Sequence, residues 1–217
     1  MVRFARESQL DGGSVSLLRA HFFQFFFSVG TRFLSSFTGF DGLSERDRRA
    51  VTDIANDGQQ SRDPGEDQVT TALQKLGIPV DFSISAMACK DPAAETTHVG
   101  LAFGIQSRMH ALHSEWLRGL FSRVKEASRA TMGRRQTLAI AVYCRSGRHR
   151  SVAAVEIATH VLQSDGCVVM KPAHTCDYWW QWRGCQNWRR GCSECTSVVD
   201  ARKAALYAQA APMWREA

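Results

Sequence analysis

The sequence predicts an α/β fold: a small three-layer domain with a mainly parallel sheet and a phosphate-binding strand-loop-helix. Between residues 78 and 171, short apolar stretches alternate with longer stretches whose apolar residues recur at helical spacing. The segment "CRSGRHRS", residues 144–151, stands between a predicted strand and a predicted helix. With 217 residues, 44% hydrophobic and 22% charged, the chain has the composition of a soluble globular protein.

The first half of the regular pattern contains a strand, a loop and a helix. The stretch "IPVDFSI", 78–84, mixes β-branched and aromatic residues and predicts a short buried strand. A loop follows at 85–104, with Asp91-Pro92 as its turn signal. Apolar residues at steps of three and four then predict one helix over 107–129. The residues of this stripe are Met109, Leu112, Trp116, Leu117, Leu120, Phe121 and Val124.

The second half surrounds the loop. "TLAIAVY", 137–143, is a near-continuous apolar run, typical of a strand covered on both faces. A helical stripe over 151–163 follows the loop, and Gly166 can end that helix before a third strand at 167–171. This order predicts a parallel α/β unit with right-handed crossovers. The alanine-rich stretch 201–211 predicts a closing helix.

The regular pattern divides the chain into four parts. Residues 1–40 are an N-terminal segment of uncertain role, whose phenylalanine cluster at 22–27 is too short to cross a bilayer. Residues 41–75 are polar and charged, which predicts a linker with at most a short helix. The α/β domain is expected at 76–172. A Cys- and Trp-rich extension and the closing helix occupy 173–217.

The loop at 144–151 has the residues needed to hold phosphate. It lies at the carboxyl end of a strand and the amino end of a helix, where open α/β sheets bind ligands and unpaired amides favour anions. Gly147 lets the backbone turn, and Arg150 can offer a planar fork to two oxygens. The thiolate of Cys144 would be favoured beneath these donors. The predicted phosphate-binding residues are Cys144, Arg145, Ser146, Gly147, Arg148, His149, Arg150 and Ser151.

The loop resembles the signatures of two families. Cys-x-x-Gly-x-x-Arg-Ser is similar to the loop of cysteine-dependent protein tyrosine and dual-specificity phosphatases. This resemblance implies that Cys144 attacks phosphorus, Arg150 holds the phosphoryl oxygens and Ser151 assists release. The longer string "AIAVYCRSGRHRSVAAVEIA" more closely resembles the C-terminal domain of the RapZ family of regulatory proteins, whose loop reads roughly Cys-Thr-Gly-Gly-x-His-Arg-Ser-Val. The RapZ resemblance implies a phosphosugar-binding, RNA-associated domain, and it is stronger over 136–163 than over 78–135.

Individual residues favour binding over turnover. His149 and Val152 match the RapZ version of the loop. Phosphatases usually have His immediately before the cysteine, where this chain has Tyr143, and the upstream acid in a suitable loop is Asp91. The predicted function is therefore the binding of a phosphorylated small molecule, phosphosugar or nucleotide-like, in a regulatory role. A cysteine-dependent phosphatase is the alternative.

The chain also departs from the RapZ pattern. Ser85 and Met87 stand where RapZ-like domains carry an Asp and an Arg two residues apart, so part of the family's pocket is altered. The kinase-like half of RapZ, with its Walker A loop, has no counterpart in this sequence. No nucleotide cofactor is therefore implied.

The segment 174–195 suggests a structural metal site. It holds four of the seven cysteines and ends in a Cys-x-x-Cys pair, which can supply two of the four tetrahedral ligands of zinc. Reduced thiols packed among tryptophans are the alternative. The predicted ligands are four of these five residues: His174, Cys176, Cys185, Cys192 and Cys195.

The same segment suggests a second partner, because its tryptophans alternate with arginines. Indole faces beside guanidinium groups can stack bases and neutralise phosphates, so an RNA-binding adaptor is a further alternative. Tryptophans that cap the core, with solvated arginines, give the competing interpretation. The residues concerned are Trp179, Trp180, Trp182, Trp188, Arg183, Arg189 and Arg190.

Cysteine usage and the N-terminus bear on localisation. Seven unevenly spaced cysteines without a secretory signal favour a reducing, intracellular compartment, with the cytoplasm as the first choice. Basic residues at Arg3, Arg6 and Arg19 leave organelle targeting as an alternative. No membrane span is predicted.

Overall fold

The sheet is built from five parallel strands in the order β2-β3-β1-β4, with β5 also paired to β1. The computed structural model describes residues 23–30, 64–92, 97–131, 137–177, 180 and 185–217. The strands are β1 (Phe23–Gly30), β2 (Phe82–Ser85), β3 (Thr137–Cys144), β4 (Val168–Val169) and β5 (Ala173–His174). Strands and crossover helices alternate as the sequence predicts, which confirms the parallel α/β class.

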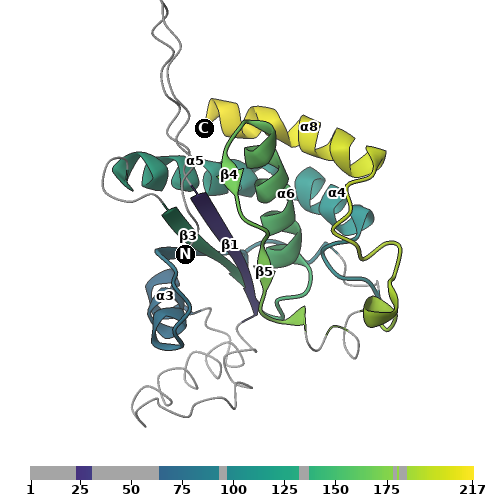
Figure 1. Cartoon of the computed structure of the whole chain (residues 1–217), viewed down its shortest axis with the longest axis horizontal. Helices are drawn as coiled ribbons and strands as arrows, with labels where there is room; N and C mark the ends of the chain where they lie inside the picture. Colours follow the sequence, from purple (N-terminus) through teal and green to yellow (C-terminus); the bar gives the residue numbers. More distant parts are fainter. Residues whose placement is uncertain (1–22, 31–63, 93–96, 132–136, 178–179, 181–184) are drawn as a thin grey trace, which may run out of the picture.

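Helices cover both faces of this sheet, as Figure 1 shows. Along β3, Ile140 and Val142 pack into the main core, whereas Ala141 and Tyr143 belong to a second cluster on the other face. The second cluster is formed with α3, and α4, α5 and α6 lie on the main-core side with α8 packed on them. The helices are α3 (Glu66–Lys75), α4 (Phe103–Leu112), α5 (Ser114–Thr131), α6 (Arg150–Ser164) and α8 (Ala201–Glu216).

Part of the phenylalanine cluster near the N-terminus, from Phe23 onward, lies in a strand inside the sheet. β1 pairs with β3 along its whole length, from Phe23 opposite Thr137 to Gly30 opposite Cys144. These residues belong to the segment 1–40, which was predicted to lie outside the α/β domain. A buried parallel strand is a continuous apolar run without alternation, so its sequence has no period that identifies it as a strand. The partner of β1 lies more than a hundred residues later in the chain, so the run alone did not reveal the pairing. The remainder of the 1–40 segment lies outside the described residues.

Two further boundaries differ from the sequence prediction. The single helix expected over 107–129 is two helices, because the backbone at His113 leaves the helical region (φ −132°, ψ 33°). The predicted linker contains α3, whose Val69, Ala72 and Leu73 are buried at a spacing of three and four residues. A short apolar stripe in a polar stretch was therefore enough to form a packed helix. Residues 41–63 of the linker lie outside the described ranges.

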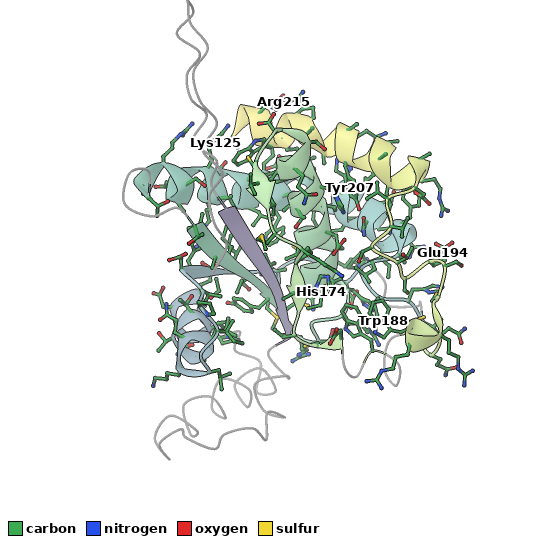
Figure 2. All side chains as sticks on the ribbon, viewed as in Figure 1. Lys125, His174, Trp188, Glu194, Tyr207 and Arg215 are labelled. Atoms are coloured by element: carbon green, nitrogen blue, oxygen red, sulfur yellow. The ribbon has the colours of Figure 1, made fainter. Side chains whose placement is uncertain are left out.

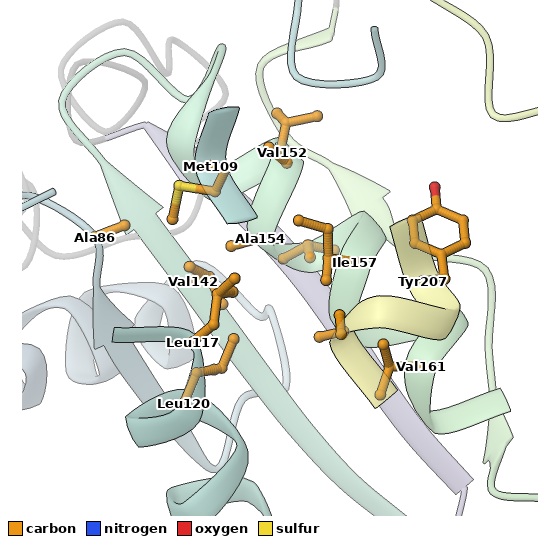
Figure 3. Close-up of a cluster of buried hydrophobic side chains, with 14 of the residues drawn as sticks. Ala86, Met109, Leu117, Leu120, Val142, Val152, Ala154, Ile157, Val161 and Tyr207 are labelled. Carbon is orange, nitrogen blue, oxygen red and sulfur yellow. The ribbon is translucent and has the colours of Figure 1, made fainter. Parts of the chain in front are cut away.

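The C-terminal extension shares the main core with the α/β domain. Leu206, Tyr207 and Trp214 of α8 belong to the same buried cluster as Ile157 and Val161 of α6. Figure 3 draws part of this cluster. The closing helix predicted from its alanines is thus an integral layer rather than an appendage. Among the helices of the described part of the chain, none is long and apolar enough to cross a membrane.

Candidate functional site

The candidate anion site is the loop that joins β3 to α6. β3 ends at Cys144, the helix begins at Arg150, and Gly147 turns the backbone in the left-handed region with φ +59°. Within the described part of the chain, the amides of Ser146, Gly147 and Arg148 donate to no other group. These three amides stand at the amino end of a 15-residue helix, whose dipole favours an anion.

Cys144 lies at the base of this loop. Its side chain is buried, and its Sγ lies 3.3 Å from the Oγ of Ser151, which is also buried. A second thiol, Cys89, lies close enough to interact with it. Burial raises the pKa of Cys89 to about 11, although the charge of Arg150 acts in the opposite direction. Cys89 is therefore a neutral thiol at physiological pH.

Arg150 points one amino group away from the loop. Its Nη1 donates to the carbonyl oxygens of Met87 at 2.9 Å and Cys89 at 2.8 Å, with Ala86 at 3.4 Å. Arg150 thereby holds the turn that follows β2. The fork predicted for Arg150 holds two phosphate oxygens, but with Nη1 engaged only Nε and Nη2 are without a described partner for that purpose.

Arg148 supplies a second guanidinium at the loop. Its Nε is buried and has no hydrogen-bond partner among the described residues. Burial lowers the pKa of Arg148, while the negative charges of Asp91 and the Cys144 thiolate would raise it. A buried guanidinium N–H without a partner is costly, so an acceptor placed at this atom would be stabilising. Arg148 is one of the predicted phosphate-binding residues, but the sequence assigned it no role of its own.

His149 anchors the loop instead of lining it. Its side chain is 1% exposed; Nδ1 lies 2.9 Å from Asp91 Oδ1 and Nε2 lies 3.0 Å from the carbonyl oxygen of His98. This residue, which distinguished the two family signatures, therefore ties the loop to two neighbouring segments.

A possible metal centre lies beside the loop. The ligand atoms of His98, Cys185, Cys192 and Cys195 all lie within 4.8 Å of one another. His98 Nδ1 is 3.4 Å from Cys195 Sγ and 3.8 Å from Cys192 Sγ. Zn–S bonds of about 2.3 Å in a tetrahedron separate two sulfurs by about 3.8 Å, so the arrangement fits one ion.

The cysteines of this centre lie on tight turns. The backbone amides of Glu194 and Cys195 hydrogen-bond to the sulfur of Cys192; burial alone would raise the pKa of this thiol, and these bonds lower it. Burial raises the pKa of Cys185, while the amide of Asn187 donates to its sulfur. Amide-to-sulfur hydrogen bonds of this kind stabilise thiolates, the form that binds metal.

The ligand set differs from the predicted one at one position. Three of the five predicted residues join the cluster, but its fourth member is His98 and not His174 or Cys176. His174 Nε2 lies 3.0 Å from Glu156 Oε1, and the buried Cys176 packs with Tyr143 in the second core cluster. Both are therefore engaged elsewhere. His98 lies 87 positions before Cys185, and no short spacing pattern connects the two.

The tryptophans near the cluster are largely structural. Trp180 is fully buried, and its indole N–H donates to the carbonyl of Gly147 at 3.3 Å. Trp188 packs edge-on against it with ring centroids 4.9 Å apart, and Figure 2 shows Trp188 near His174. Arg189 and Arg190 are exposed, so RNA binding stays a prediction based on these two cations. Trp179, Trp182 and Arg183 lie outside the described residues.

Comparisons of the chain with protein-family models, with curated proteins and with solved structures give no match. The resemblance to RapZ therefore depends on the sequence of residues 136–163 and, less strongly, 78–135, and the resemblance to the phosphatases depends on the loop at 144–151.

Proposed function

We propose that this domain binds a phosphorylated small molecule at residues 144–151, in the manner of a RapZ C-terminal domain and in a regulatory role. One observation carries the proposal: at the amino end of α6, the amides of Ser146, Gly147 and Arg148 and the buried Nε of Arg148 have no hydrogen-bond partner among the described residues. A phosphate group offers several acceptor oxygens and two negative charges, which suit such a set of donors.

A cysteine-dependent phosphatase is the second candidate. The 3.3 Å approach of Cys144 Sγ to Ser151 Oγ favours it, because that serine could assist the departure of the thiolate from a phosphoryl intermediate. The acid required for turnover is the weak point. Asp91 is bound to His149, and Tyr143, which stands where phosphatases have histidine, donates its hydroxyl to the Pro64 carbonyl at 2.6 Å. Binding without turnover is therefore preferred.

Replacing Arg148 with glutamine is expected to weaken phosphate binding about 10- to 100-fold, because a hydrogen bond to a charged group contributes about 1.5–3 kcal/mol. The measurement is isothermal titration of inorganic phosphate into the full chain. Arg129→Gln, which removes an exposed arginine from α5, is the matched control and should bind like the wild type. Equal phosphate affinity in Arg148→Gln and wild type would contradict the proposed site.

Hydrolysis separates the two candidates. The wild-type protein is expected to release no phenol from an aryl phosphate above the buffer rate, since Asp91, the acid that the sequence offers for turnover, is held by His149. Turnover that disappears in Cys144→Ser would instead select the phosphatase, because the hydroxyl is a far poorer nucleophile than a thiolate. The serine variant should keep its phosphate affinity in either case, so loss of binding would show that the substitution damaged the loop.

We further propose that the metal centre binds zinc and that the zinc has a structural role. Three thiols and one imidazole form a closed Cys₃His set with no position left for substrate, which is the pattern of structural zinc sites. Soft sulfur ligands disfavour magnesium and calcium, which take oxygen ligands.

A further inference from the structure

Residues 98–100 form a short segment that lies against the Cys/His cluster. The imidazole of His98 faces Cys195 Sγ at 3.4 Å and Cys192 Sγ at 3.8 Å. The next residue, Val99, is fully buried and donates its amide to Cys195 Sγ at 3.4 Å. One side chain and one amide of this segment are therefore directed at the cluster.

The same segment also lies against the anion loop. The His98 carbonyl accepts a hydrogen bond from His149 Nε2 at 3.0 Å, and the Gly100 amide donates to the Arg148 carbonyl at 2.8 Å. Arg148 and His149 are the two residues that immediately precede α6. Three consecutive residues of one segment thus contact the cluster on one side and the loop on the other.

A second connection runs from the cysteine-rich stretch itself. Trp180, five positions before the ligand Cys185, donates its indole N–H to the carbonyl of Gly147 at 3.3 Å. This residue is the one whose left-handed backbone turns the loop. Both peptide groups that flank the buried arginine are therefore held by segments that carry or adjoin metal ligands.

We infer that metal binding at His98, Cys185, Cys192 and Cys195 sets the anion affinity of the loop at 144–151. The ion ties two chain segments, at 98 and at 185–195. The first contacts the loop directly, and the second reaches it through Trp180, against which Trp188 packs. Without the ion, these segments lose their common anchor and the loop must be ordered when the anion binds, which lowers the apparent affinity. The inference depends on the proposed phosphate binding and adds a metal-dependent control to it.

The first test removes one ligand. Cys192→Ser, at a half-buried position, is expected to lose zinc by elemental analysis, whereas the wild type carries about one equivalent. Its affinity for inorganic phosphate should fall about tenfold or more, within the usual range of coupling between sites. Cys167→Ser, which alters a half-buried cysteine outside the cluster, should keep both zinc and affinity. A folded, zinc-free Cys192→Ser protein with wild-type phosphate affinity would overturn the coupling.

The second test measures the folded wild type with all four cluster residues intact, so it does not depend on how Cys192→Ser folds. Coupling is reciprocal, so saturating phosphate should tighten the retention of zinc against a coloured chelator by the same factor of about ten. Arg148→Gln should remove this effect and thereby control for direct binding of phosphate to zinc. Identical zinc affinity with and without phosphate would refute the coupling while leaving phosphate binding intact. A zinc-loaded wild type that binds no phosphate would overturn the proposed function itself.

Discussion

Replacing Gly100 with alanine is expected to destabilise the protein by about 3 kcal/mol, near the upper end of typical overpacking costs. A Cβ at this position would lie 2.4 Å from the His149 carbonyl oxygen, 2.6 Å from the Ala153 amide nitrogen and 2.7 Å from Val152 Cβ. Two of these atoms belong to the backbone at the start of α6 and cannot rotate away. The free energy of unfolding from urea titration measures the effect.

The chain provides a matched control in Gly119→Ala. A Cβ at Gly119, within α5, meets no atom within 4 Å, and alanine in a helix interior should stabilise the protein by about 0.5–1 kcal/mol. The two substitutions add the same methyl group and should change stability in opposite directions. Equal stability of Gly100→Ala and wild type would show that the backbone at 98–100 can shift at little cost in free energy. A segment that shifts so readily could not couple metal binding to the loop.

Local patterns in the sequence were sufficient to predict the elements around the loop. The apolar run of β3 and the helical stripe of α6 are neighbours in the chain. The spacing of glycine and arginine between them predicted a loop at 144–151 that joins the strand to the helix. The break at His113 could not be predicted in the same way. The apolar stripe continues in phase from Met109 to Leu117, and only the backbone at one residue interrupts it.

Partners far apart in the chain were not predictable. β1 lies beside a strand more than a hundred residues later, and its pairing depends on tertiary contacts that leave no local pattern. His98 is a similar case, since it joins three cysteines of another segment. The Cys-x-x-Cys pair predicted two members of the cluster, whereas proximity in the sequence favoured His174 and Cys176, which lie outside the cluster that the fold forms with His98.

The role of Arg150 could not be read from the motif either. The pattern specifies a guanidinium at the start of a helix, but the carbonyls of Met87 and Cys89 that engage it belong to a turn some sixty residues earlier. The buried and unpartnered Nε of Arg148 is likewise visible only after the surrounding segments are packed. The motif therefore identified the candidate loop, while only the fold shows that Arg150 holds a neighbouring turn and that Arg148 Nε is buried without a described partner.

The second large effect concerns Glu156, a carboxylate buried inside α6. Its Oε1 lies 3.0 Å from His174 Nε2 and its Oε2 lies 3.8 Å from His160 Nε2. Burial would raise the pKa of this group, but the two imidazoles outweigh burial and lower the pKa from 4.5 to about 2. Each pKa unit corresponds to about 1.4 kcal/mol, so the charged form contributes on the order of 3 kcal/mol at pH 7.

Glu156→Gln is therefore expected to lower the free energy of unfolding by about 3 kcal/mol at pH 7. Glu126→Gln, at an exposed position on α5, should cost almost nothing. Because the folded pKa is depressed, the contribution is complete above pH 4.5, the ordinary value, and is lost as the pH falls toward 2. The difference between Glu156→Gln and wild type should thus shrink to about half at pH 3. Loss of a bound metal in acid would affect both proteins, so it cancels when their free energies of unfolding are compared. A difference in free energy of unfolding that stays constant from pH 7 to pH 3 would mean that the charge of Glu156 does not stabilise the fold.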